Sequence, residues 1–188
     1  MSDGGVETTN RDLVIAVSGL HGSGKSVHAK LLAKTFGLRY VSAGTLFRRM
    51  AEDRDLTLEE MSRLAEEDPE IDKLVDDQTK IEASKGWVVI DAALSGWMVE
   101  DADIKIFLTA PFEARVRRIA NRDCASPEEA REATRLREEV ERDRFMRYYG
   151  IDIYDLSIYD VVLNTELFTI DGTAGILKRI VEEYRSSR

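Results

Sequence analysis

The 188-residue chain is predicted to adopt an α/β fold, in which helices flank a five-stranded parallel sheet. Short apolar segments alternate with amphipathic segments along the chain, and this alternation is typical of a parallel sheet covered on both faces. A glycine-rich loop follows the first apolar segment and leads into a helical pattern. Two helix-rich stretches interrupt the alternation and are expected to form insertions. The predicted strands are Leu13–Ser18, Leu38–Ser42, Trp87–Asp91, Ile104–Leu108 and Asp160–Leu163.

The glycine-rich loop reads G-L-H-G-S-G-K-S and matches the phosphate-binding pattern G-x-x-x-x-G-K-[ST]. Its glycines let successive backbone N–H groups turn toward phosphate oxygens, and the helix that begins near Lys25 adds its positive end. The Lys25 ammonium is expected to reach the β- and γ-phosphates of a nucleoside triphosphate, and the Ser26 hydroxyl is expected to bind Mg²⁺. The alternative is a glycine turn that matches the pattern by chance. The predicted contacts to ATP in this segment are Gly19, Leu20, His21, Gly22, Ser23, Gly24, Lys25, Ser26 and Val27.

Polar residues follow the second and third predicted strands, at the edge of the sheet where nucleotide sites form. Ser42 and Gly44 precede a helix that carries Arg48. This arrangement suits a second phosphate-bearing ligand, while the alternative is a solvated surface arginine. Asp91 ends the third strand, where a carboxylate either holds Mg²⁺ and its waters or caps the next helix.

The first inserted stretch covers about residues 44–85 and contains two or three helices in succession. Thr57 and Glu60 have the spacing of a capping box, and Asp68-Pro69 provides a cap followed by proline in the first helical turn. The second stretch covers about residues 121–149 and is expected to be an arm of helix, turn and helix. Its long helix starts at Ser126-Pro127 and is expected to stop at Gly150.

The arm is rich in arginine and contains no lysine. The ten arginines in and just before it are Arg115, Arg117, Arg118, Arg122, Arg131, Arg135, Arg137, Arg142, Arg144 and Arg147. Arginine without lysine favours bidentate binding of phosphate, whereas the interleaved glutamates favour surface Glu–Arg pairs, and both can hold. About three or four of these arginines are expected to touch phosphate. The arm is expected to close as a lid that excludes water.

Composition argues against several classes of protein. The net charge of −9 argues against a general nucleic-acid binder. The apolar runs are too short to span a bilayer, and the polar residues 1–11 are expected to form a disordered leader rather than a signal peptide. The single cysteine, Cys124, excludes an internal disulfide and a multi-cysteine metal site, and it favours a reducing, cytoplasmic setting. No obligate protein partner is expected.

Several further segments follow a recognisable pattern. They are Tyr40–Arg48, Ala65–Asp72, Ser95–Met98, Ile119–Asp123, Tyr149–Ile153, Asp155–Asp160 and Asn164-Thr165. With the phosphate loop, they resemble the archaeal type of cytidylate kinase, a nucleoside monophosphate kinase with a P-loop fold, over nearly everything from Asp12 onward. The resemblance implies a core, a part that binds the monophosphate (about 44–85) and a lid (about 121–149). It also implies transfer of a phosphoryl group from ATP, with Mg²⁺, to CMP or dCMP.

The resemblance further implies roles for single residues. Arg48 would clamp the phosphate of the acceptor, and Arg118 would flank the adenine of ATP. The catalytic residues would be Lys25 with Arg122, Arg137 and Arg144, the last three contacting phosphate from the lid. The monophosphate would be bound by Ser42, Gly44, Arg48, Asp91 and Gly96, and the metal by Ser26 and Asp91.

One position departs from the family pattern, and two other functions stay open. Ala93 stands where many members have an arginine that could face the acceptor. The first alternative is a kinase for another monophosphate, AMP or UMP. The second is a P-loop nucleotide switch, against which the chain has neither an N-K-x-D-type segment nor D-x-x-G after the third predicted strand.

Overall fold

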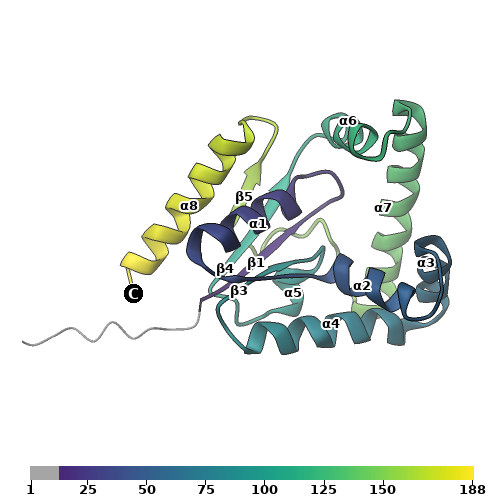
Figure 1. The fold of residues 1–188 in the computed structure, drawn as a ribbon, viewed down its shortest axis with the longest axis horizontal. Coiled ribbons are helices and arrows are strands. Elements are labelled where there is room, and N and C mark those ends of the chain that lie inside the picture. The colour runs from purple at the N-terminus through teal and green to yellow at the C-terminus, as the bar shows by residue number, and fades with distance from the viewer. Residues whose placement is uncertain (1–12) are drawn as a thin grey trace, which may run out of the picture.

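The computed structural model describes residues 13–188, so the expected disordered leader lies outside the described residues. The strands are β1 (Val14–Gly19), β2 (Arg39–Ser42), β3 (Val88–Asp91), β4 (Ile104–Thr109) and β5 (Val161–Asn164). They form one parallel sheet in the order β2-β3-β1-β4-β5, which confirms the predicted fold class (Figure 1). The predicted ends of each strand differ from the observed ends by at most one residue. Polar or glycine residues bound most of the apolar runs and mark where the strands end.

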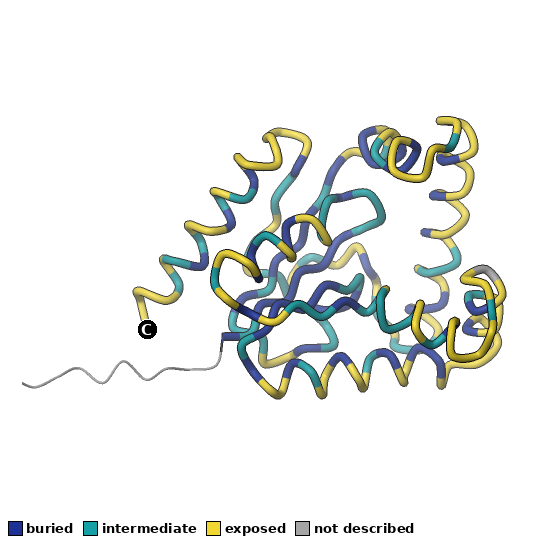
Figure 2. Tube along the Cα trace, in the orientation of Figure 1, coloured by how far each residue is buried: buried dark blue, intermediate teal, exposed yellow. Residues whose placement is uncertain are grey.

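Helices cover both faces of the sheet. They are α1 (Lys25–Phe36), α2 (Ala43–Glu52), α3 (Leu58–Glu67), α4 (Pro69–Ser84), α5 (Ser95–Met98), α6 (Phe112–Asp123), α7 (Pro127–Tyr149) and α8 (Ile170–Ser186). On one face, Leu32 of α1 and Leu177 of α8 join the same buried cluster as Ile15 of β1. On the other face, Ala83 of α4 packs against Ile90 of β3. The three central strands, β3, β1 and β4, are accordingly the most continuously buried part of the chain, whereas the edge strands β2 and β5 are mostly half-buried or exposed (Figure 2). Among residues 13–188, every helix is too short or too polar to cross a lipid bilayer.

The helix ends follow from local sequence. Thr57 and Glu60 form the predicted capping box at the start of α3, and the Asp68 side chain accepts a hydrogen bond at the start of α4. A second capping box, made by Ser126 and Glu129, begins α7. Gly150 ends α7 in the left-handed conformation, at a φ of 66°.

The register of the sheet brings the predicted polar residues together. Asp91 of β3 is paired with Ser42 of β2 on one side and with Val17 of β1 on the other. The carboxyl ends of these three strands therefore meet at one edge, from which the loop between β1 and α1 emerges. The insertion α2–α4 and the arm α6–α7 stand beyond that edge (Figure 1).

Candidate active site

The loop between β1 and α1 has a backbone that depends on glycine at two positions. Gly24 caps α1 in the left-handed conformation, with a φ of 92°. Gly22 has a φ of 75°, and a Cβ atom there would lie 2.7 Å from the backbone oxygen of Arg115. The loop therefore lies directly against the start of α6. It turns into α1 at Lys25, as the sequence predicted, so that the amino end of this helix faces the edge of the sheet.

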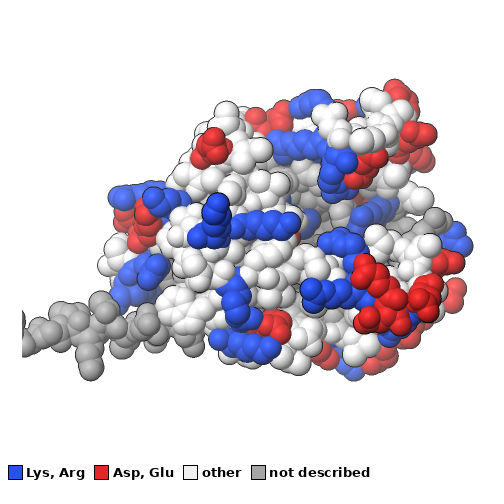
Figure 3. Space-filling model, viewed as in Figure 1, with Lys and Arg blue, Asp and Glu red and all other residues white. Residues whose placement is uncertain are grey.

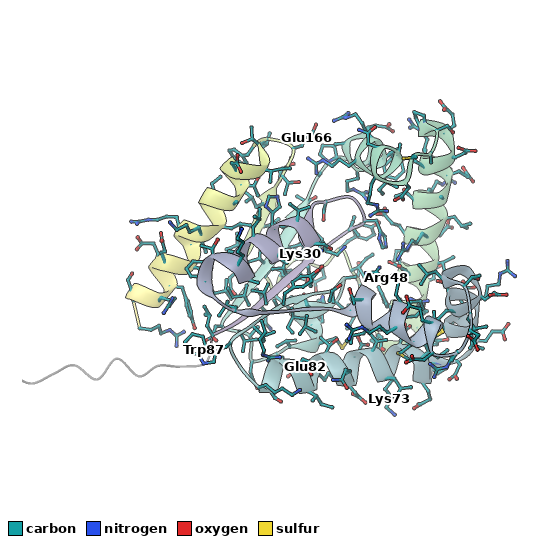
Figure 4. All side chains as sticks on the ribbon, viewed as in Figure 1. Lys30, Arg48, Lys73, Glu82, Trp87 and Glu166 are labelled. Atoms are coloured by element: carbon teal, nitrogen blue, oxygen red, sulfur yellow. The ribbon has the colours of Figure 1, made fainter. Side chains whose placement is uncertain are left out.

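A cleft of about 660 Å³ opens between the phosphate loop, the helices α2–α4 and the helix α7. Its volume lies in the range of sites for nucleotide-sized ligands. Of the predicted site residues, eight besides His21 line it: Lys25, Ser26, Ser42, Gly44, Arg48, Asp91, Arg137 and Arg144. Figure 3 shows this hollow with Lys and Arg side chains on its rim, and Figure 4 shows Arg48 at the edge that faces α7. The structure thus gathers residues from four separate segments around one cleft.

Lys25 and Asp91 form the charged floor of the cleft. Removal from water lowers the pKa of Lys25, while the nearby Asp91 and Glu141 carboxylates oppose this shift. The buried Asp91 carboxylate accepts a 2.7 Å hydrogen bond from the Tyr40 hydroxyl. Burial and this bond raise the pKa of Tyr40 to about 12. Helix α5 begins after Leu94 and has no side-chain cap. Asp91 therefore does not cap this helix, which was the alternative to metal binding.

Two oxygen donors at this floor fit a magnesium ion. The Ser26 hydroxyl and the Asp91 carboxylate both line the cleft, and hydroxyl and carboxylate oxygens are the kind of ligand that Mg²⁺ takes from proteins. Within residues 13–188, no group of three or more His, Cys, Asp or Glu side chains could hold a metal alone. The site therefore fits an ion that obtains its remaining ligands from phosphate and water, which is the usual arrangement for Mg²⁺ at nucleotides.

His21 connects the phosphate loop to α7. Its Nε2 lies 2.7 Å from Oε2 of Glu141, and Arg137 donates a 3.0 Å hydrogen bond to the other oxygen of that carboxylate. Burial would raise the pKa of Glu141, but His21 and Arg137 outweigh it and lower the pKa to about 2. Sequence reasoning placed His21 in the loop but missed Glu141. The signal was present in α7, where Glu138 and Glu141 lie on the same face as the buried Phe145.

Arg115 belongs to the interior of the protein. Only 5% of it is exposed, and its guanidinium donates to both carboxylate oxygens of Glu138 on α7. It also donates to the backbone oxygens of Ala110 and His21, at 3.1 Å and 3.0 Å. One side chain thus joins the start of α6, the phosphate loop and α7. Several other arginines of the arm form surface pairs, such as Arg131 with Glu113, which confirms the Glu–Arg pairs, while the phosphate contacts stay a prediction.

Three further predicted site residues lie outside the lining of the cleft: Arg118 and Val27, predicted as ATP contacts, and Arg122, predicted as a catalytic residue of the lid. The phosphate-loop residues Gly19, Leu20, Gly22, Ser23 and Gly24 also lie outside it. Arg118 donates to the Thr165 hydroxyl at 2.9 Å and to the Gly22 backbone oxygen at 3.3 Å, so it bridges the phosphate loop and the segment after β5. Arg122 is exposed and paired with Asp123. Val27 is 46% exposed on α1.

Two predicted site residues make structural contacts that the sequence did not indicate. Arg144 is buried, and its Nε lies 2.8 Å from Oδ2 of Asp72 on α4, while its predicted contact with phosphate stays a prediction. Gly96 is buried outside the cleft, and a Cβ atom there would lie 2.4 Å from the ring of Tyr159. Packing against Tyr159 therefore explains the need for glycine at this position, and contact with an acceptor stays a prediction.

Asp76, one turn after Asp72 on α4, also lines the cleft and accepts a 2.5 Å hydrogen bond from the Tyr149 hydroxyl. Burial raises the pKa of Asp76 to about 6, although the Tyr149 bond opposes the shift. Its ionised form is therefore disfavoured in the folded protein. Ionising Asp76 in the folded protein costs free energy of folding. This cost is absent below the unfolded pKa of 3.8 and reaches its full value above about 6, so the folded protein loses stability as pH rises through that window.

The variant Asp76→Asn is accordingly expected to be more stable than the original chain at pH 7.5, by about 1–3 kcal/mol, and to lose most of that advantage at pH 4. Urea unfolding at the two pH values measures the difference. Asp77→Asn, at the exposed neighbouring acid, is the matched control and should show little change at either pH. An equal gain at both pH values for Asp76→Asn would contradict the prediction.

Comparison with known proteins identifies related sequences over most of the chain. Residues 14–167 match the model of a family described as the cytidylate kinase-like family. The chain is 47% identical over 173 residues to a cytidylate kinase of Staphylothermus marinus, with 92% of this chain and 98% of that protein covered. It is 44% identical over 179 residues to a cytidylate kinase of Halobacterium salinarum, with 94% and 93% covered.

Solved structures with the same fold are more distant in sequence. A shikimate kinase from Bacteroides thetaiotaomicron has a TM-score of 0.65 at 16% identity, covering 90% of this chain and 98% of its own. An uncharacterized protein from Eubacterium ventriosum has a TM-score of 0.66 at 18% identity, covering 94% and 99%. At this level of identity the likeness concerns the fold alone.

Proposed function

Because the chain belongs to the cytidylate kinase-like family, we propose that it transfers the γ-phosphoryl group of ATP to CMP or dCMP. The observation that carries this proposal is a single cleft with two sets of anion-binding groups. The phosphate loop and Lys25 lie on one side of the cleft, and Arg48 with Gly44 lies on the other. A kinase that brings two phosphate-bearing substrates together needs both sets, whereas a nucleotide switch needs only the first.

On the donor side, the amino end of α1 and the Lys25 ammonium bind the β- and γ-phosphates of ATP. The ammonium stands in a partly desolvated place beside Asp91, so its charge is little screened by water. Arg118 lies where the loop meets the segment after β5, and we assign it to the outer side of the ATP site, flanking adenine.

On the acceptor side, Arg48 binds the phosphate of the monophosphate. Its guanidinium is anchored by a 3.1 Å hydrogen bond to the Thr45 hydroxyl, and a Cβ atom on Gly44 would lie 3.6 Å from it. The absence of a side chain at Gly44 leaves the guanidinium open toward the cleft. Ser42, which caps α2, lies beside it at the end of β2.

Ser26 and Asp91 would hold Mg²⁺, which neutralises charge on the transferred phosphoryl group when bound. Tyr40 fixes the orientation of the Asp91 carboxylate through its hydrogen bond. In the reaction, an oxygen of the acceptor phosphate forms a bond to the γ-phosphorus while the bond from that phosphorus to the β,γ-bridging oxygen breaks. Lys25 stabilises the charge that develops on the leaving oxygen, and the products are ADP and CDP or dCDP.

The two insertions have distinct roles in this proposal. The helices α2–α4 form the part that binds the monophosphate, and the segment at about 121–149, which carries α7, closes over both nucleotides as a lid. Arg137 lines the cleft from α7 and is partly neutralised by Glu141, so an incoming phosphate competes with that carboxylate for its guanidinium. Closure excludes water and thereby favours transfer to the acceptor over hydrolysis.

An acceptor screen tests the function itself. Purified protein is incubated with ATP and Mg²⁺ and with CMP, dCMP, UMP or AMP in turn, and formation of ADP and of the diphosphate product is measured. Highest turnover is expected with CMP or dCMP. Preference for AMP or UMP would identify the alternative kinase, and slow hydrolysis without transfer to any acceptor would identify a nucleotide switch.

The variant Arg48→Ala is expected to raise KM for the monophosphate by about 10- to 100-fold, since it removes a charge-assisted hydrogen bond to phosphate. KM for ATP should change far less, because Arg48 lies across the cleft from the phosphate loop. Steady-state kinetics with each substrate varied in turn measure both constants. The control is Arg49→Ala, at the exposed neighbouring arginine outside the lining of the cleft. A larger effect on ATP than on the monophosphate would show that the acceptor site is misplaced.

A further inference from the structure

Two buried polar groups in the acceptor side of the cleft retain unused hydrogen-bonding capacity. Asp72 of α4 and Arg144 of α7 both line the cleft, and each is only 8% exposed. Asp72 Oδ2 and Arg144 Nε form a buried ion pair at 2.8 Å, and the other oxygen of the Asp72 carboxylate has no hydrogen-bond donor among the residues that the structure describes. Buried polar atoms in folded proteins are nearly always hydrogen-bonded. Because Asp72 lines the cleft, a ligand group there is in a position to supply that donor.

The charges of the cleft determine which part of a nucleotide reaches Asp72. Lys25, Arg48 and Arg137 attract phosphate near the strand ends, whereas on the side of α4 the Asp72–Arg144 pair carries no net charge and ionised Asp76 repels phosphate. A monophosphate is therefore oriented with its phosphate at Arg48 and its base toward α4. This step rests on the proposed function, which provides the acceptor.

The walls on this side suit a flat ring. Val75 of α4 and Leu58 of α3 line the cleft together with Asp72, so apolar surface is available for the faces of a base while the carboxylate addresses its edge. Burial raises the pKa of Asp72, although the Arg144 guanidinium opposes the shift and favours the ionised form. An ionised carboxylate accepts hydrogen bonds and donates none.

We propose that the Asp72 carboxylate accepts a hydrogen bond from the exocyclic amine of the acceptor base and thereby selects an aminopyrimidine over an oxopyrimidine. Cytosine presents an amino donor at position 4, and uracil presents a carbonyl acceptor at the same place. A carbonyl oxygen opposite Asp72 would leave two acceptors facing each other in a desolvated place. Arg144 acts on Asp72 as a positioning residue, because its ion pair with Oδ2 fixes the orientation of the carboxylate.

The alternative that Asp72 and Asp76 form a cation site receives no support. Within the part of the chain that the structure describes, no group of three or more His, Cys, Asp or Glu side chains has the arrangement of a metal site. The other alternative is a purely structural pair between α4 and α7. That role would affect all acceptors equally, so the ratio of activities on two pyrimidines separates it from base selection.

The first test compares kcat/KM for CMP and UMP in the original chain, in Asp72→Asn and in the control Asp77→Asn. An asparagine amide offers both a carbonyl and an N–H, so it accepts from cytosine less strongly and can donate to uracil. Asp72→Asn is expected to lower kcat/KM for CMP by about 10- to 100-fold and to raise the UMP-to-CMP ratio at least about tenfold. Asp77→Asn should leave the ratio unchanged. An unchanged ratio in Asp72→Asn would overturn the assignment.

The second test needs no variant and therefore does not depend on the folding of Asp72→Asn. The original chain is assayed with an analogue of CMP that carries hydrogen in place of the 4-amino group. Its kcat/KM is expected to fall by about 10- to 100-fold relative to CMP, with KM for ATP unchanged. Equal use of CMP and the analogue overturns the role of Asp72 while leaving the kinase function intact. If the original chain phosphorylates no monophosphate at all, the proposed function fails, and the assignment of Asp72 falls with it.

Discussion

Replacing Lys25 with alanine is expected to lower kcat/KM for phosphoryl transfer by about 100-fold or more, the scale of losing one preorganised charge at a developing anion. Lys25 is the lysine of the cleft, and it stands beside Asp91 where water screens its charge poorly. The loss should be visible in kcat as well as in KM for ATP, because the charge on the leaving oxygen grows as the bond breaks.

The control for this variant is Lys34→Ala, at an exposed lysine near the other end of the same helix. It removes the same charge from α1 without approaching the cleft, so its kinetics should match those of the original chain. Circular dichroism of both variants checks that the fold is retained. Near-normal turnover in Lys25→Ala would remove the basis for an ATP site in this loop.

The variant Glu138→Ala is expected to destabilise the protein by about 3–5 kcal/mol, because it leaves the Arg115 guanidinium buried without its counter-charge. For a chain of this size, that loss corresponds to a fall in Tm of roughly 10 °C. The phosphate loop should weaken as well, since Arg115 also holds the His21 backbone oxygen. Urea unfolding and the Kd for ATP measure the two effects.

The exposed pair of Glu113 and Arg131 joins the same two helices and provides the comparison. Glu113→Ala should change stability by less than about 1 kcal/mol, because water screens such a pair. A double variant that replaces Arg115 and Glu138 with methionines should recover much of the stability lost in Glu138→Ala. Similar losses in Glu113→Ala and Glu138→Ala would contradict the interior role of Arg115.

Features of this protein that depend on neighbouring residues in the chain were predictable from sequence. The strands, the capping boxes and the glycine-rich loop each consist of residues close together in the sequence, so their periodicity and spacing mark them. The meeting of Ser42, Asp91 and the loop at one edge also followed, since parallel strands place their carboxyl ends together.

Partners brought together by tertiary packing were not predictable. His21 and Glu141 are 120 residues apart, and nothing near either residue indicates the other. Arg115 and Arg144 have the same surroundings in sequence as the exposed arginines of the arm, and only the packing of α7 against the loop and α4 buries them. The sequence showed which arginines exist, but the direction that each one faces on its helix decided between phosphate, carboxylate and solvent.

Helix α7 makes the two ends of the cleft mechanically interdependent. Glu141 holds the phosphate loop through His21, and Arg144, less than one turn later, contacts Asp72 on α4. A rigid helix cannot rotate or slide at one of these contacts without disturbing the other. If a nucleotide bound at the loop changes the affinity for the second nucleotide by some factor, the second nucleotide changes the affinity for the first by the same factor. The dissociation constant of either nucleotide is therefore a property of the pair, and its value depends on whether the opposite end of the helix is engaged.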